Sequence, residues 1–399
     1  RRSMLWRPRT RLPLALAFVV RWRRGMSLDV SRARLDTPSA ATFAHLNAAG
    51  ASPPPVAAVT AQVAHIELEA QVGAYEAAAR VEDRVQGVYC SAAQLLHAAS
   101  PTEIALLDSS STALAKAIYS VRLQPGDVLL SAGEAEYAAN AIALAQHARR
   151  HGARVEWVPG DPRGGVDLAA LAEALSEHGP AARAVCLTHV PTNGGVVADA
   201  AAVGRVLRDT LGRAEDGGPV YILDACQSVG QLEVDVGAIG CDFAATTSRK
   251  WLRGPRGAGI LYCRGRALGD GPGGVPILDE PPMLDMHSAT WAWDAGPDGP
   301  GFTLQPGARR FEFWEANTAA KLGLGAALDY CLALGPRAVE AAVRAAGARL
   351  REAVAEVPGV TVADLPGDGP GARGLSGIVA MEVERLGGAA RGRVHGGRG

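Results

Sequence analysis

The sequence predicts an α/β protein with a large, mostly parallel sheet, followed by a smaller α+β domain. Through the middle of the chain, short runs rich in Val, Ile and Leu alternate with Ala- and Leu-rich stretches of helical length. This alternation is the signature of parallel strands joined by crossover helices. After about residue 315, two long helical stretches precede two short apolar runs, which indicates a second domain. No internal repeat is visible.

Short apolar runs that follow turns or helical stretches are the expected strands. The run at 128–130, for example, follows the turn Gln-Pro-Gly-Asp at 124–127, where Pro and Gly favour a chain reversal. A seven-stranded sheet is expected from residues 104–107, 128–130, 155–158, 184–188, 220–223, 243–246 and 260–262. Residues 360–362 and 378–383 are the expected strands of the second domain.

The intervening Ala- and Leu-rich stretches are the expected helices. Asp167 is suited to cap one of them, because its carboxylate can accept hydrogen bonds from the first free N–H groups of a helix. The helices of the large domain are expected at 112–121, 138–150, 167–177 and 200–211. Two longer ones, at 316–334 and 336–357, open the second domain.

Composition narrows the class of protein. The 399 residues are 48% hydrophobic and 20% charged, which is ordinary for a globular enzyme. A net charge of -1 gives no overall field that would favour nucleic acid or a membrane, so neither is expected as a partner. The six cysteines include no CxxC pair and mostly lie in apolar runs, which indicates a reducing, cytoplasmic location. The histidines show no metal-ligand spacing, so no metal site is expected.

Both ends of the chain differ from the rest. Residues 1–25 are Arg-rich around an apolar run at 12–20, which is too short to span a bilayer. We expect this extension to lie outside the fold. The large domain, with an N-terminal arm, is then expected at 26–310 and an incomplete small domain at 311–385. Residues 386–399 turn into Gly, Arg and Ala without apolar periodicity and are expected to form an irregular tail.

Polar segments follow five of the predicted strands. They are 108–112, 136–140, 188–195, 224–227 and 246–250. In open α/β sheets, ligands bind beyond the carboxyl ends of the strands. We therefore expect these segments to converge on one site.

Lys250 and Asp224 suggest the chemistry of that site. Lys250 lies at a strand end before a Gly-Pro-Arg-Gly turn, and Asp224 ends an apolar strand 26 residues earlier. A lysine amine can hold an aldehyde cofactor as a Schiff base. A carboxylate beside a pyridine nitrogen is the matching half of a pyridoxal 5'-phosphate (PLP) site. The pattern favours PLP over the alternative that Asp224 only caps a helix.

Neighbouring polar residues can complete a PLP site. Hydroxyls at a helix start, from Ser110, Ser111 and Thr112, suit a phosphate dianion, although such a run could also be an ordinary N-cap. Other candidate contacts are Arg249 and Thr247 to the phosphate, Gln227 to the phenolic oxygen of the ring, and Tyr137 stacking on the ring face.

These residues resemble the class V aminotransferase family, the fold-type I PLP enzymes that include cysteine desulfurases. The resemblance runs from about residue 46 to 383 and is most specific over 221–262. It implies that Lys250 holds the cofactor, that Asp224 pairs with the pyridine nitrogen, and that Thr192 lies near the phenolic edge of the ring. It also implies a homodimer, because residues 310–317 resemble the segment that reaches the neighbouring subunit's cofactor. Glu315 stands where many members have Thr, and a glutamate would repel phosphate there.

Within the family, the segment Ser-Arg-Lys-Trp-Leu-Arg-Gly-Pro-Arg-Gly at 248–257 is similar to the C–S lyases of ergothioneine biosynthesis. The resemblance implies an enzyme acting on an amino acid at Cα, with β-elimination from a cysteine S-conjugate as the first expectation. Transamination or epimerisation is the second. Cysteine desulfuration is the third, because it needs a mobile thiol and residues 365–374 contain none. A PLP-binding remnant without turnover is the non-enzymatic alternative, because no arginine for the substrate carboxylate can be assigned beyond Arg373.

Overall fold

The computed structural model describes residues 28–133, 136–269, 278, 280–294 and 300–384. Its centre is a seven-stranded sheet with the strand order β1-β8-β7-β6-β4-β2-β3. These strands are β1 (Ile104–Leu107), β2 (Val128–Ala132), β3 (Arg154–Val158), β4 (Ala182–Thr188), β6 (Val220–Asp224), β7 (Phe243–Thr247) and β8 (Gly259–Cys263). Within this sheet β8 alone runs opposite to the other strands. The predicted mostly parallel seven-stranded sheet is confirmed.

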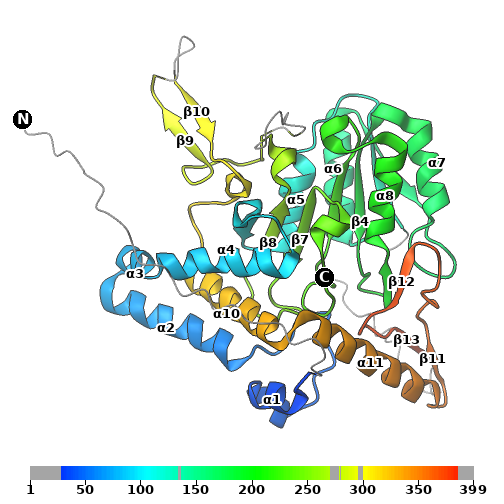
Figure 1. Ribbon diagram of the computed structural model, residues 1–399, viewed down its shortest axis with the longest axis horizontal. Helices are drawn as coiled ribbons and strands as arrows, with labels where there is room; N and C mark the ends of the chain where they lie inside the picture. Colours follow the sequence, from blue (N-terminus) through cyan, green and yellow to red (C-terminus); the bar gives the residue numbers. More distant parts are fainter. Residues whose placement is uncertain (1–27, 134–135, 270–277, 279, 295–299, 385–399) are drawn as a thin grey trace, which may run out of the picture.

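Helices cover both faces of the sheet, so most of its strands are buried (Figure 1). One face carries α5 (Ser110–Tyr119) and α6 (Ala138–His151). The other carries α4 (Glu82–Leu96), α7 (Leu168–His178), α8 (Ala200–Leu211) and α10 (Thr318–Leu334). Successive residues of β1 face opposite sides of the sheet. Leu106 packs on the side covered by α4, α7, α8 and α10, and Leu107 packs on the side covered by α5 and α6. Because both faces of these strands are buried, their side chains are apolar at consecutive positions rather than at alternate ones.

Side-chain caps explain where three of the helices begin. Ser109 caps α5 by accepting a hydrogen bond from the Thr112 N–H, so this helix begins at Ser110 rather than 112. Asn317 caps α10 in the same way, which moves its start from 316 to Thr318. Asp167 caps α7 as expected, accepting from the N–H groups of Ala169 and Ala170.

The C-terminal part contains α11 (Pro336–Ala355) and three short strands, β11 (Val360–Val362), β12 (Ala372–Leu375) and β13 (Met381–Val383). β11 pairs with β13, but β12 pairs with β5 (Val196–Ala198) of the preceding part, a pairing that the apolar pattern does not reveal. α10 packs against α4 and α2 (Val56–Val72). The domain boundary at residue 310 stays a prediction, and residues 1–25 and 386–399 lie outside the described residues.

Several further elements have no counterpart among the predicted ones. Before the sheet lie α1 (Val30–Leu35), α2, α3 (Ala74–Arg80) and α4. The short α9 (Val236–Ile239) precedes β7. The hairpin of β9 (Ala289–Ala292) and β10 (Gly301–Leu304) projects away from the sheet (Figure 1). Within the described residues, none of the helices combines the length and apolar character needed to cross a bilayer.

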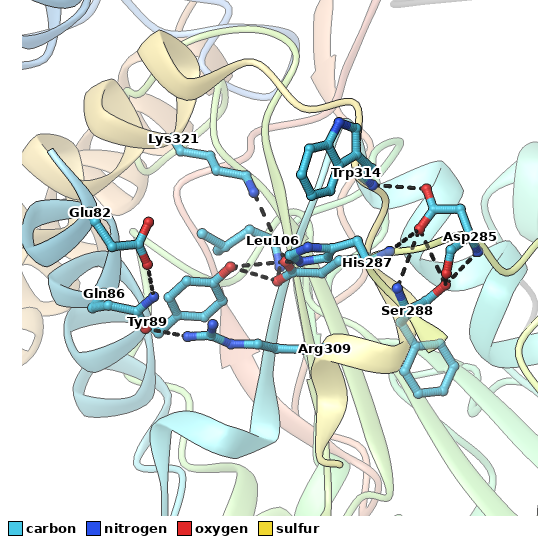
Figure 2. A network of polar contacts seen from close by, with 12 residues as sticks. Glu82, Gln86, Tyr89, Leu106, Asp285, His287, Ser288, Arg309, Trp314 and Lys321 are labelled. Atoms are coloured by element: carbon cyan, nitrogen blue, oxygen red, sulfur yellow. Dashed lines mark hydrogen bonds and ion pairs between the residues drawn. The ribbon is translucent and has the colours of Figure 1, made fainter. Parts of the chain in front are cut away.

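Glu312 is buried where several of these elements meet. Figure 2 labels its partners Tyr89, Leu106, His287 and Lys321. Its carboxylate accepts hydrogen bonds from the Tyr89 hydroxyl on α4, at 2.9 Å, and from the Leu106 N–H of the edge strand β1, at 2.7 Å. His287 Nε2 lies 3.0 Å from it, and Lys321 Nζ on α10 lies 3.9 Å away. The carboxylate thus satisfies an edge-strand N–H that would otherwise be buried without a partner. The strand that it fixes leads directly into residues 108–111.

Candidate active site

The five predicted strand-end segments meet in one cavity of about 250 Å³. It opens at the carboxyl ends of the parallel strands, where ligands of α/β sheets bind. All of the predicted site residues line it except Thr112: Ser110, Ser111, Tyr137, Thr192, Asp224, Gln227, Thr247, Arg249 and Lys250. The strand order therefore brings residues that are up to 140 positions apart in the sequence to the same cavity.

Lys250 follows β7 in a tight turn that its own carbonyl helps to close by accepting from the Arg253 N–H at 3.0 Å. The residue is only 8% exposed, yet it lines the cavity. The Nζ atom lies 5.8 Å from the centre of the Tyr137 ring. Among the described residues it makes no hydrogen bond or ion pair. A partly desolvated amine without a carboxylate partner is suited to nucleophilic chemistry.

Asp224 faces the same cavity as Lys250 from the end of β6. Its carboxylate is buried, and two donors hold it. Oδ1 accepts from the Cys226 N–H at 2.9 Å, and Oδ2 accepts from Asn140 Nδ2 at 2.7 Å. A buried carboxylate held by donors on both oxygens can keep a fixed direction toward a cationic partner.

The N-terminus of α5 forms another wall of the cavity. Ser109, Ser110 and Ser111 line it together with two arginines, Arg249 and Arg256. Oriented N–H groups, hydroxyls and guanidinium groups make this wall suitable for a phosphate. Arg249 also donates to Thr247 Oγ1 at 3.2 Å, which positions both side chains.

Gly259, the first residue of β8, allows the α5 start to approach the sheet. A Cβ atom at this position would lie 2.6 Å from the Ser109 carbonyl carbon and 2.8 Å from the Ser110 nitrogen. Only a residue without a side chain fits there, so Gly259 supports the phosphate-binding wall without lining the cavity itself.

Trp251, the residue after Lys250, orients the Gln227 side chain. Its Oε1 accepts from Trp251 Nε1 at 2.9 Å, so its amide nitrogen points the other way, toward Thr192 Oγ1 at 3.4 Å and the Ala49 carbonyl at 3.1 Å. Thr192 and Gln227 thus lie side by side in the cavity, as expected for contacts to one edge of a ring.

Thr112 is the one predicted contact that does not line the cavity. Its hydroxyl lies 3.0 Å from Ser109 Oγ, the helix cap, which sequence reasoning missed. The sequence had also not singled out several other lining residues, namely Asn140, Thr188, Cys226 and Arg256. Asn140, Thr188 and Cys226 lie within the strand-end segments, so the position beyond a strand end was the signal that could have found them. Arg256 lies outside these segments, shortly before β8. Arg373, the weak candidate for the substrate carboxylate, lies on β12 and is not among the residues that line the cavity.

The residues present fit PLP. The cavity combines a buried amine, a buried carboxylate, an exposed aromatic face and a cationic wall with free N–H groups, which match the aldehyde, pyridine nitrogen, ring and phosphate. The family model for class V aminotransferases matches residues 44–385, which is most of the chain. The chain belongs to the class V aminotransferase family. The expected PLP-dependent enzyme class is thereby confirmed.

Relatives with curated names agree with this family. The chain is 31% identical over 310 residues to a probable cysteine desulfurase of Methanothermobacter thermautotrophicus, covering 77% of this chain and 71% of that protein. It is 26% identical over 356 residues to a cysteine desulfurase of Pectobacterium atrosepticum, covering 84% and 80%.

Solved structures show the same fold. An apo cysteine desulfurase from Thermococcus onnurineus NA1 superposes with a TM-score of 0.73 at 21% identity, covering 90% of this chain and 83% of that one. A lysine-to-alanine mutant of C-DES, with glycine covalently linked to its PLP cofactor, gives a TM-score of 0.75 at 23% identity, covering 88% and 86%. The predicted fold type I architecture of this class V chain is confirmed.

Proposed function

We propose that this class V enzyme is a C–S lyase that removes a sulfur leaving group from a cysteine S-conjugate by β-elimination. The observation that carries the proposal is the placement of the six cysteines, all of which are described and free of disulfides. Desulfuration needs a mobile thiol that can reach the substrate and accept its sulfur. β-Elimination needs only a base and a site for the leaving group.

None of the six thiols meets the requirement for a sulfur acceptor. Cys90 is exposed but lies on α4 and does not line the cavity, whereas the other five are buried. Only Cys226 lines the cavity. Burial, followed by the charge of Asp224, raises the pKa of the Cys226 thiol well above its usual range, so this thiol stays protonated and weakly nucleophilic.

The residues of the site can support the elimination. PLP, when bound, supplies an electron sink for the electrons left at Cα. We expect the Nζ atom of Lys250, a residue that lines the cavity, to take the proton from the substrate Cα. The Cβ–S bond then breaks, and its electron pair leaves with the sulfur. Uptake of water by the remaining three-carbon fragment gives pyruvate and ammonia.

Product analysis with a cysteine S-conjugate tests this proposal. The purified enzyme is expected to release pyruvate and ammonia in equal amounts, and Lys250→Ala should lower turnover by about 10²- to 10⁴-fold, the usual contribution of a positioned base. Cys226→Ala should leave the identity of the products unchanged. Formation of alanine and a protein persulfide from free cysteine, abolished in Cys226→Ala, would instead establish a desulfurase.

Cysteine desulfuration is the second candidate, and the names of the relatives favour it. The same assay separates the remaining alternatives. A new keto acid formed with a different amino acid indicates an aminotransferase, and loss of optical purity without other products indicates an epimerase. A PLP absorbance band that no amino acid changes indicates a binding remnant.

We also propose that the enzyme is a cytoplasmic homodimer. The absence of disulfides among the cysteines fits a reducing compartment. Val56, Val59, Val63 and Ile66 form an exposed apolar stripe on α2, each with more than 40% of its surface exposed. Light scattering should give twice the chain mass, and Val63→Glu combined with Ile66→Glu should lower it to that of one chain.

A further inference from the structure

Glu136 lies behind the cavity, at the centre of a hydrogen-bond chain that ends on Asp224. Its Oε1 accepts from three donors, Thr188 Oγ1 at 2.6 Å, Asn140 Nδ2 at 2.9 Å and the Tyr137 N–H at 2.9 Å. Its Oε2 lies 3.1 Å from Ser131 Oγ. Glu136 itself does not line the cavity, whereas Thr188, Asn140 and Tyr137 do.

Asn140 connects the two acids. Its side chain is 4% exposed, and its single NH₂ group donates one hydrogen to Glu136 Oε1 and the other to Asp224 Oδ2. An amide nitrogen has two donors, so both are used, and the Asp224 carboxylate is held by a group that Glu136 holds in turn.

Asp224 is buried and Glu136 is half-buried, and two carboxylates joined by one amide repel each other when both are ionised. Burial, supported by the negative charge of Asp224, raises the pKa of Glu136, although its hydrogen bonds act in the opposite direction. The Ser131 hydroxyl donates to Oε2, so the Glu136 carboxyl group accepts from four donors, three on Oε1 and one on Oε2, and its position is fixed on both oxygens.

We propose that Glu136 is a positioning residue: through Asn140 it orients the Asp224 carboxylate toward the cofactor ring, and through Thr188 it orients a hydroxyl that lines the cavity. The Thr188 hydroxyl donates its hydrogen to Glu136. The hydroxyl oxygen of Thr188 therefore presents its lone pairs to the cavity and acts there as an acceptor.

The choice of glutamine or leucine at position 136 separates this role from a purely structural one. Glu136→Gln keeps the shared acceptor, because its carbonyl can replace Oε1 for Thr188, Asn140 and the Tyr137 N–H, and the Ser131 hydroxyl can turn to accept from its NH₂. Glu136→Leu removes every hydrogen bond while remaining buried. Glu136→Gln should retain PLP within about twofold of the wild-type dissociation constant, whereas Glu136→Leu should weaken it by about 10-fold or more, as expected when buried donors lose a partner.

Asn140→Asp tests the connection itself with almost no change in shape. It replaces the two donors by an acceptor between two acids, and should raise the PLP dissociation constant by about 10- to 100-fold. The exposed Asn47, whose Oδ1 accepts from the Gly50 N–H, gives the matched control Asn47→Asp, which keeps that contact and should leave PLP binding unchanged.

The measurement is loss of PLP from the holoenzyme on dilution, followed by its visible absorbance, with thermal unfolding of each variant recorded in parallel. It needs no substrate, so its outcome is independent of whether the enzyme is a C–S lyase. PLP retention in Asn140→Asp equal to wild type would overturn the proposal. Equal damage from Glu136→Gln and Glu136→Leu would also overturn it, because the acceptor that Glu136→Gln retains for Asn140 and Thr188 would then make no difference.

Discussion

The Nζ atom of Lys250 lies 5.8 Å from the centre of the Tyr137 ring, although the two residues are 113 positions apart in the sequence. Tyr137 is 39% exposed, with its ring beside the cavity rather than in a packed core. A flat ring and an amine at this separation leave room between them for the edge of a planar cofactor. We therefore expect this pair to define one face of the PLP site.

Removal of the Tyr137 ring should weaken PLP binding, whereas removal of its hydroxyl should not. Tyr137→Ala is expected to cost about 0.5–1.5 kcal/mol of binding free energy, the value of one aromatic contact. Tyr137→Phe keeps the ring and should bind PLP like wild type. Titration of the apoenzyme with PLP measures both. Equal affinities for the Ala and Phe variants would show that the ring does not stack.

Gly259→Ala should disturb the phosphate-binding wall from behind. The added methyl would meet the Ser109–Ser110 backbone at less than 3 Å, so the start of α5 must move away from its place beside Arg249 and Arg256. We expect weaker binding of PLP but little change for pyridoxal, which lacks the phosphate. Gly87→Ala on α4 has open space around its Cβ and should leave both affinities unchanged. Equal loss of PLP and pyridoxal affinity in Gly259→Ala would contradict a phosphate-specific effect.

Glu312→Leu should destabilise the apoenzyme strongly. It leaves the Tyr89 hydroxyl and the Leu106 N–H buried without their acceptor (Figure 2). Each such group costs about 1–3 kcal/mol, so the free energy of unfolding should fall by about 2–6 kcal/mol. Glu315→Gln, three residues away and exposed, should change it by less than about 0.5 kcal/mol. Urea unfolding of both variants checks the difference, and similar midpoints would show that Glu312 is dispensable.

His189 should make the protein less stable in mild acid. Burial, followed by the charge of Arg373, lowers its pKa to about 4 in the folded chain, from an ordinary value of 6.5. Between these two values the unfolded chain binds a proton that the folded chain does not. The free energy of unfolding should therefore fall by up to about 3 kcal/mol as the pH drops from about 6.5 to 4.

Comparison with His189→Gln isolates this contribution. The variant lacks the titrating ring, so its free energy of unfolding should depend less steeply on pH across this interval than that of wild type. The two slopes can be measured by denaturant unfolding at a series of pH values. Parallel slopes would mean that His189 does not titrate differently in the folded and unfolded chains.

The sequence by itself determined the sheet strands and the ligand edge. The buried strands are continuous apolar runs, and the polar residues that follow them identify the strand ends, so Lys250 and Asp224 could be assigned to the one cavity that both line. The sequence identified only some of the helix N-caps. Asp167 was found, but Ser109 stands among four consecutive hydroxyl residues whose pattern does not say which one ends the loop.

The tertiary structure alone decided how these residues support one another. Asn140 is a helix residue 84 positions before Asp224, and only the alignment of β2 and β6 through β4 brings its amide between Asp224 and Glu136. Trp251, Gly259 and Glu312 likewise act through contacts that no local pattern encodes, because a side chain's partner across a sheet depends on strand order and register. Apolar periodicity specifies which face of an element is buried, whereas packing of distant elements determines which polar groups meet there.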